Sequence, residues 1–345
     1  MKKRLFATTA IAALFVVALF AQKPHTIAFY NIENFFDTIN DPNINDDEFT
    51  PEGKNNWTSA KYYKKLANME QVFFDIAAVN KAFPTVIGIA EVEVRTVLED
   101  IASTPKLAPA NYRIVHYDSP ERRGVDVAFF YRPDKFKLEG SFAERAIIPE
   151  RPDFRTRDIL TMWGTIEGEE FFFAVAHWSS RWGGKDQSSF LRIANGTQMR
   201  SIVDSVRTLR PQTKFVVMGD FNDDPTDESV AVALGAKGSI KDLAKDDLYT
   251  PYTAMLKAGY GTLAYYDAWN IFDNIVVSEN LVNAENDKLK LQKSIYNKKF
   301  YGNIFKSDYL IQQDGKYKGY PYRSFSGGAF VGGYSDHLPV FINID

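Results

Sequence analysis

Residues 214 to 223 read KFVVMGDFND, an apolar run that ends abruptly in a glycine, two acids and an amide. Such a run is typical of a buried β-strand, and its polar end is typical either of a turn or of a functional site at the edge of a sheet. Taken alone, the Gly-Asp-Phe-Asn-Asp end favours a turn, because these residues adopt turn geometry easily. The remainder of the chain therefore decides how the stretch is interpreted.

Five further apolar runs carry similar polar groups at one end. Three end in Tyr-Asn-Ile-Glu-Asn, Ile-Ala-Glu-Val-Glu and Ala-His-Trp-Ser-Ser, and two are preceded by Phe-Asp-Asn and Ser-Asp-His. If neighbouring strands alternate in direction, the ends of some strands and the starts of others meet on one rim of a sheet. The pattern therefore predicts convergence there of Asn31, Glu91, His177, Asp220, Asp273 and Asp336.

Converging carboxylates repel one another unless a cation lies between them. Glu91, Asp220 and Asp336, with the amides of Asn31 and Asn222, offer oxygen ligands of the kind that Mg²⁺, Mn²⁺ and Ca²⁺ prefer. The chain has no cysteine and four histidines, which disfavours zinc. We therefore expect a hard divalent ion, Mg²⁺ or else Mn²⁺ or Ca²⁺.

Two of the four histidines lie in these polar clusters. His177 follows a buried strand and His337 adjoins Asp336, so each is placed to reach a phosphate group or the water that attacks it. His25 and His116 have no polar neighbours at ligand spacing and are interpreted as structural.

The hydrophobic patterns predict an α/β chain without strict alternation of strand and helix. Helical periodicity covers Ser59 to Lys81 and Ser188 to Leu209, and 40–56 and 283–333 are expected to be long loops. The predicted strands are Thr26 to Tyr30, Thr85 to Ala90, Tyr112 to Tyr117, Val125 to Tyr131, Ile159 to Ile166, Phe171 to His177, Lys214 to Met218, Ile275 to Val277 and Leu338 to Ile342.

Each motif alone has a plainer explanation, for example a capping turn at Ser335-Asp336-His337 or solvent-facing side chains at Glu91 and Glu93. Six motifs in this order nevertheless resemble the signature of the endonuclease/exonuclease/phosphatase superfamily, which includes the pancreatic deoxyribonuclease-like enzymes. The resemblance spans nearly the whole chain after its N-terminal segment.

The resemblance implies an α/β (α+β) fold, a four-layer αββα sandwich of two mainly antiparallel sheets flanked by helices, with one active site at the rim. It also implies that Glu91 is the principal metal ligand. The metal and phosphate site would be completed by Asn31, Asp220, Asn222 and Asp336.

The catalytic roles are implied in the same way. His337, oriented by Asp273, would activate the attacking water, and His177 would hydrogen-bond a non-bridging phosphate oxygen. The implied reaction is in-line hydrolysis of a phosphodiester to an alcohol and a phosphomonoester. A silent binding protein of the same fold would lack one of these carboxylates or histidines, and none is missing.

The sequence departs from the family pattern at two positions, Asp126 and Asn274. Asn274 follows Asp273 where many relatives carry an aromatic residue. Asp126 stands where related enzymes often place an acid that orients the first histidine, so we expect it to be the partner of His177. A register slip of one residue would turn it away. Arg157 is expected either to face the phosphate or to form a surface ion pair with Asp153 or Asp158.

The N-terminus indicates export. Lys2, Lys3 and Arg4 precede an apolar run that ends at Ala21, which predicts a signal peptide over residues 1–21 and a catalytic domain over residues 22–345. A retained membrane anchor is the alternative, although the run is shorter than a usual span of about 20 residues. The mature protein is expected in the periplasm or outside the cell, without a further membrane span and as a monomer.

The overall charge of the chain does not indicate nucleic-acid binding. The formal net charge is −3, so any attraction for phosphate has to be local. Residues 293–323 mix basic and aromatic side chains, and Arg181 follows His177 closely, which favours nucleic acid, DNA or RNA, as the substrate of an endonuclease. Alternatives are a phospholipid such as sphingomyelin, or an inositol or sugar phosphate, and for residues 293–323 a solvated loop.

Overall fold

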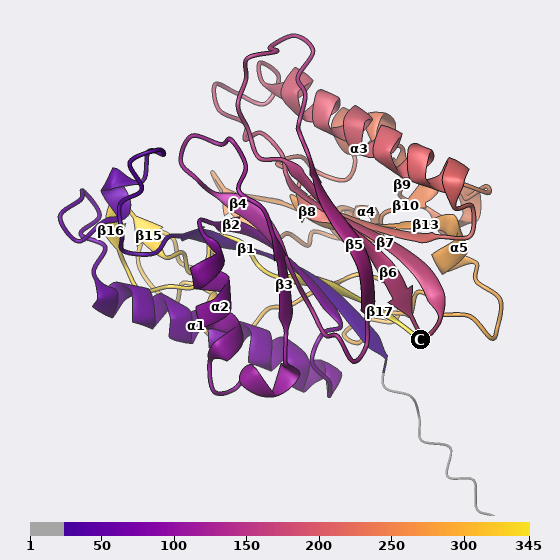
Figure 1. Cartoon of the computed structure of the whole chain (residues 1–345), viewed down its shortest axis with the longest axis horizontal. Coiled ribbons are helices and arrows are strands. Elements are labelled where there is room, and N and C mark those ends of the chain that lie inside the picture. Colours follow the sequence, from indigo (N-terminus) through magenta and orange to yellow (C-terminus); the bar gives the residue numbers. More distant parts are fainter. Residues whose placement is uncertain (1–23) are drawn as a thin grey trace, which may run out of the picture.

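Two β-sheets pack face to face between helices that cover both outer faces, as the computed structural model in Figure 1 shows. It describes residues 24–345, apart from the side chain of Asp242. The six-stranded sheet has the order β14 (Asn303–Ile304), β17 (Val340–Ile344), β1 (His25–Phe35), β2 (Val86–Val92), β4 (Asp126–Tyr131) and β3 (Arg113–His116). The seven-stranded sheet has the order β5 (Lys137–Glu144), β6 (Ile159–Ile166), β7 (Glu169–His177), β8 (Lys214–Asp220), β13 (Asp273–Ser278), β10 (Leu248–Tyr249) and β9 (Ala236–Lys237).

The helices supply the outer layers of the sandwich. In Figure 1, α1 (Ser59–Asn80) and α2 (Arg95–Ser103) lie on one side, and α3 (Ser189–Leu209) lies on the other. The α1 side chain of Phe73 packs edge-on against Phe130 of β4, and α3 covers the seven-stranded sheet through Met199 and Val203. The expected four-layer sandwich is therefore confirmed.

The core between the sheets explains the continuous apolar runs. Phe129 of β4 contacts Phe173 of β7 with ring centroids 6.5 Å apart, so the inner faces interdigitate. All seven residues of β8 are buried, because α3 covers its outer face as well. A strand that is covered on both sides is apolar throughout rather than alternating.

The strand directions bring the polar ends to one rim. β1 runs parallel to β2 and β7 runs parallel to β8, while β4, β13 and β17 run antiparallel to their neighbours β2, β8 and β1. The carboxyl ends of four central strands therefore meet the starts of three others. The two main sheets are mixed but mainly antiparallel, as expected, and the predicted convergence holds.

Several short elements escaped the sequence patterns. β5 is an edge strand with a partly exposed side-chain pattern, and α4 (Tyr252–Lys257) and α5 (Glu279–Val282) are too short to show a period. The predicted loops are largely irregular. They contain the 3-10 turns η1 (Asp47–Phe49) and η5 (Asp308–Leu310), the strand β14 and the hairpin β15 (Phe325–Ser326) with β16 (Ala329–Phe330), while β11 (Leu263–Tyr265) and β12 (Ala268–Asn270) form another hairpin.

The N-terminal prediction falls largely outside the structure. The expected signal peptide, residues 1–21, lies beyond the part of the chain that the structure describes. Within residues 24–345, no helix has the length and apolar character needed to cross a bilayer.

Candidate active site

Glu91 is held at a bulge near the end of β2. Its backbone is left-handed, with φ of 65°, and the pairing of β2 with β4 shifts register between Ala90 and Val92. The carboxylate accepts the Asn34 backbone N–H at 2.8 Å and the Asn31 amide at 3.2 Å. Because a left-handed non-glycine residue costs about 1–3 kcal/mol, these contacts offset strain that aims the side chain at the rim.

Asn31 joins Glu91 to Asp220 of the opposite sheet. Its amide nitrogen also donates to Asp220 Oδ2 at 3.0 Å, while its own oxygen accepts the Glu33 backbone N–H at 2.9 Å. In this arrangement Asn31 orients two carboxylates and its oxygen is already engaged. Burial raises the pKa of Asp220 to about 6, with His337 lowering it and Asp273 raising it.

His177 closes the group from the last position of β7. Its Nε2 lies 3.5 Å from Asp220 Oδ2 and 3.8 Å from Glu91 Oε1. Its Nδ1 is buried and has no hydrogen-bond partner within residues 24–345. Burial, helped by the nearby Arg157 guanidinium, holds the pKa of His177 well below its usual value.

These three side chains can hold a metal ion. Glu91, His177 and Asp220 each offer one ligand atom, and these atoms lie within 4.8 Å of one another. Two carboxylates and one neutral imidazole suit a hard or borderline divalent ion, and Nε2 of His177 faces both carboxylates. The donor set therefore fits the divalent metal that the sequence predicted.

His337 forms the second imidazole of the site, at the start of the segment that leads into β17. Its Nδ1 donates to Asp273 Oδ2 at 2.8 Å, and its Nε2 lies 3.6 Å from Asp220 Oδ2. Burial alone would lower the pKa of His337, but the carboxylates of Asp273 and Asp220 raise it well above its usual value. The Ser335 hydroxyl donates to the Asn31 carbonyl at 2.7 Å and so anchors this segment to β1.

Asp336 lies at the border of the group rather than inside it. Its Oδ1 is 4.0 Å from His337 Nε2, and its Oδ2 accepts a hydrogen bond from Arg323 Nη2 at 2.9 Å. The group of close ligand atoms does not include it.

Asn222 and Arg181 shape the loop after β8. Asn222 has a left-handed backbone, with φ of 51°, and its side-chain amide donates to the Trp178 carbonyl at 3.0 Å. Arg181 was expected to contact substrate, but its guanidinium lies against Asp223, Asp224 and Asp227 at 3.1, 3.7 and 2.9 Å. These carboxylates neutralise the charge of Arg181, so Arg181 stabilises the loop after β8.

The expected pairing of Asp126 with His177 does not form. Asp126 accepts the Ser119 backbone N–H at 3.0 Å and lies 3.5 Å from Nε2 of His116. The physical reason is strand parity: Phe129 faces the core between the sheets, so Asp126 shares the opposite, helix-side face with Phe130. His116 consequently has polar neighbours that its sequence surroundings did not reveal.

Arg157 faces the site rather than the surface. It is buried, donates to the Trp178 carbonyl at 3.1 Å, and forms no ion pair with Asp153 or Asp158 among the described residues. Asp158 instead lies 3.9 Å from Arg145. Burial lowers the pKa of Arg157, and Glu121, Glu91 and Asp220 oppose that shift.

A buried charge network behind the site was missed from the sequence. Lys65 of α1 is fully buried and donates to the hydroxyl of Ser324, and Glu33 of β1 accepts the Ser324 and Phe325 backbone N–H groups. Glu33 also lies 3.5 Å from Nε of Arg323, the partner of Asp336. Lys65 lies four residues before buried Met69, and a lysine on the apolar stripe of a helix was the available signal.

The basic and aromatic segment 293–323 divides into two parts. In the first, Phe305 is buried and Lys293 lies over the Tyr301 ring, 3.9 Å from its centroid. The second part lines a pocket of about 610 Å³ that reaches Asp336. Its aromatic and basic lining includes Tyr265, Tyr266, Lys316, Tyr317, Tyr320, Tyr322 and Arg323.

Comparison with known proteins agrees with this architecture. The sequence profile of the Endonuclease/Exonuclease/phosphatase family matches residues 26–345. A comparison with curated protein sequences gives no significant match.

Solved structures share the fold at low sequence identity. The human Nocturnin catalytic domain is 16% identical with a TM-score of 0.52, covering 94% of this chain and 95% of that one. Zebrafish (D. rerio) TDP2 with a single-strand DNA product is 13% identical with a TM-score of 0.54, covering 94% and 100%. A mannosyl-6-phosphatase of Bacteroides thetaiotaomicron is 17% identical with a TM-score of 0.53, covering 93% and 99%.

Proposed function

The chain belongs to the endonuclease/exonuclease/phosphatase family and is a metal-dependent phosphoester hydrolase, and from this premise we propose that it is an endonuclease acting on DNA or RNA. The observation that carries the proposal is the tyrosine-lined pocket beside Asp336. Tyrosine rings stack on nucleobases of any sequence, and lysine and arginine pair with backbone phosphates. A pocket with both, which reaches Asp336 at the border of the site, suits a nucleotide next to the scissile phosphate.

The metal in this proposal is Mg²⁺, or Mn²⁺ or Ca²⁺, held by Glu91 and Asp220. When bound, such an ion neutralises the phosphate and stabilises the charge on the leaving oxygen. Asn31 holds the two carboxylates in place through its amide. Asp336 and Asn222 complete the border of the phosphate site.

The two histidines take separate tasks. Asp273 fixes Nδ1 of His337, which leaves Nε2 to position the attacking water. With Asp220 engaged by a metal ion, this carboxylate would raise the pKa of His337 less, and Nε2 could take a proton from that water. Nε2 of His177, which faces Glu91 and Asp220, is placed to donate to a non-bridging phosphate oxygen. Arg157, buried behind this group, adds positive charge toward the same phosphate. We also propose, from the N-terminal pattern, that the protein is exported. As a separate proposal, it acts as a monomer.

A sugar-phosphate phosphatase is the second candidate. The tyrosine-lined pocket also contains Asp267, Gln312 and Asp314, and aromatic faces next to acids and amides suit sugar hydroxyls as well. Such an enzyme would need only one phosphate in the site and a free sugar in the pocket.

A substrate panel separates these functions. Mature protein with Mg²⁺ is tested on plasmid DNA, RNA, sphingomyelin, inositol phosphates and mannose 6-phosphate, with and without a chelator. Chelator-sensitive cleavage of DNA or RNA is expected. Hydrolysis of the sugar phosphate alone would replace the nuclease proposal, and the lipid alone would overturn both.

The panel needs a matched pair of variants. Glu91→Gln removes a metal-facing carboxylate and should abolish activity on the true substrate. Glu99→Gln changes an exposed glutamate on α2 that only pairs with Arg95, so it should retain activity.

A further inference from the structure

A second pocket, rich in arginine, borders the active site. It has a volume of about 480 Å³, and Arg122, Arg151, Arg155 and Arg157 line it, with Glu121 and Asp153 as its only acids. Ser179 and Ser180, which follow His177 closely, also line it. Positive charge therefore gathers here although the chain as a whole is acidic.

These arginines form no ion pairs with carboxylates in the part of the chain that the structure describes. Within the described residues Arg122, Arg151 and Arg155 have no carboxylate partner. Arg157 is 9% exposed, and its buried Nε has no hydrogen-bond partner in the same part of the chain. A buried guanidinium N–H without a partner costs free energy, so it points to an anion that satisfies it.

The strand order places this pocket opposite the tyrosine-lined pocket. Glu121–Arg122 precede β4 and Arg157 precedes β6, whereas Asp336 precedes β17 and Ala264–Asp267 lie at the hairpin before β13. In the two sheets β1, β2, β7 and β8 lie between these positions, and they carry the metal-binding group. The two pockets thus flank the catalytic centre along one rim.

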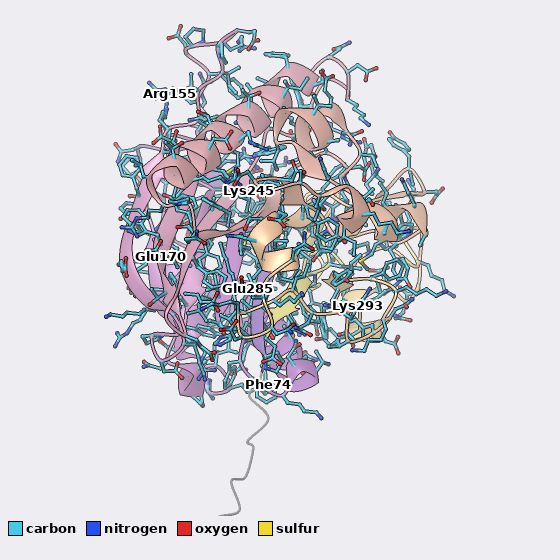
Figure 2. All side chains as sticks on the ribbon, turned by 90° about the vertical axis from the view of Figure 1, so that its right-hand side faces the viewer. Phe74, Arg155, Glu170, Lys245, Glu285 and Lys293 are labelled. Atoms are coloured by element: carbon cyan, nitrogen blue, oxygen red, sulfur yellow. The ribbon has the colours of Figure 1, made fainter. Side chains whose placement is uncertain are left out.

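Figure 2 labels Arg155, one of the residues that line this pocket. Arg155 lies at the end opposite Phe74, whose side chain borders the start of β1. The arginine loop is therefore at the rim where the strands β1 and β2 finish. Trp182 lines the same pocket and is 89% exposed, which offers a free aromatic face beside the positive charge.

We propose that the arginine-rich pocket binds a second phosphate of the substrate, one nucleoside away from the scissile phosphate, with Trp182 stacking on the base between or beyond them. This subsite rests on the proposed nuclease function, because it requires a substrate with phosphates on successive units. Guanidinium groups bind phosphate through charge-assisted hydrogen bonds, and tryptophan is a strong stacking partner. A sugar monophosphate would leave this pocket without a ligand.

The test compares two inhibitors of one small substrate. Hydrolysis of bis(p-nitrophenyl) phosphate with excess Mg²⁺ is inhibited by adenosine 5′-monophosphate or by adenosine 3′,5′-bisphosphate. The bisphosphate should inhibit the wild type about 10-fold more strongly, as a gain of about 1.4 kcal/mol gives. The Arg151→Gln/Arg155→Gln protein should reduce that ratio to about one.

Controls separate this subsite from folding and from the nuclease proposal. Arg113→Gln removes an exposed arginine at the far end of β3 and should keep the wild-type ratio, and thermal unfolding checks that all three proteins are folded. Equal inhibition by the two nucleotides in the wild type would overturn the second-phosphate site. A retained ratio without cleavage of any oligonucleotide would instead overturn the nuclease function and keep the subsite.

Discussion

Individual residues in this site depend on neighbours that are distant in sequence. Asp273 holds His337 from 64 positions away, and Asn31 bridges Glu91 and Asp220 across the two sheets. The contacts to Asp273 and Asp220 are buried and the contact to Glu91 is part-buried, so the loss of one partner leaves the other unsatisfied. Single substitutions can therefore separate chemistry from folding.

Replacing His337 by glutamine should lower kcat by about 10²–10⁴-fold, because glutamine can accept or donate a hydrogen bond but cannot exchange a proton near neutral pH. The measurement is the steady-state rate on the substrate identified by the panel. His25→Gln is the matched control, since His25 bonds to Thr85 at the opposite end of β1. Comparable losses in both variants would contradict the assignment of His337.

Asp126→Asn should change activity by no more than a few-fold, because Asp126 contacts Ser119 and His116 and not His177. It should lower the free energy of unfolding by about 1–3 kcal/mol, as expected when a buried hydrogen-bonded carboxylate is altered. Urea unfolding and the rate assay together check this. A 100-fold loss of activity at unchanged stability would show that Asp126 acts on the first imidazole after all.

At the level of elements, the ends of strands and one buried helix residue organise the rim. Strand and helix positions were largely predictable because their apolar periods are local properties of the sequence. The face of a strand on which a side chain lies, and the partners of charged side chains, were not predictable. The face of β4 on which Asp126 lies depends on the register between β4 and β2. Arg181 meets Asp223, Asp224 and Asp227 only after the loop folds. These contacts between distant or irregular segments leave no periodic signal.

Lys65 of α1 links that helix to the segment before His337, and its titration should be measurable. Burial lowers the pKa of Lys65 to about 8, although Glu33 and Asp336 oppose the shift. Between pH 8 and the unfolded value of about 10.4, the unfolded lysine binds a proton that the folded one lacks. This group therefore makes the wild type more stable as pH rises, by up to about 1.4 kcal/mol per pH unit.

Lys65→Met should remove that pH dependence. The free energy of unfolding of the wild type minus that of Lys65→Met should increase from pH 7.5 to 9.5, measured by urea titration. Lys64→Met, an exposed neighbour on the same helix, should show no such change. A difference that stays constant with pH would mean that Lys65 titrates at its ordinary value.

The whole molecule is one sandwich whose active rim carries ligands from both sheets. The family, the fold class and the convergence of strand ends followed from motif order and strand-end chemistry. The arginine pocket did not follow, because its members come from the separate segments before β4 and β6. The tyrosine-lined pocket was predicted only in part, because the first half of residues 293–323 packs elsewhere and does not line it.

Divalent metal should stabilise the folded protein as a whole. An ion that binds only the native state raises the free energy of unfolding by RT ln(1 + [L]/Kd), which is about 2.7 kcal/mol at 100 times Kd. Thermal unfolding with increasing Mg²⁺ or Mn²⁺ should therefore show a rising Tm, reversed by chelator. Glu91→Gln should abolish the rise, whereas an equal rise in that variant would place the ion elsewhere.

Because Glu91 belongs to one sheet while His177 and Asp220 belong to the other, neither half of the sandwich contains a working centre by itself. Catalytic activity therefore reports whether the two sheets are packed together. A partly unfolded species that keeps one sheet intact would retain part of the far-ultraviolet circular dichroism signal but would have no activity. In a denaturant titration, activity should vanish no later than the near-ultraviolet signal of the aromatic side chains buried between the sheets.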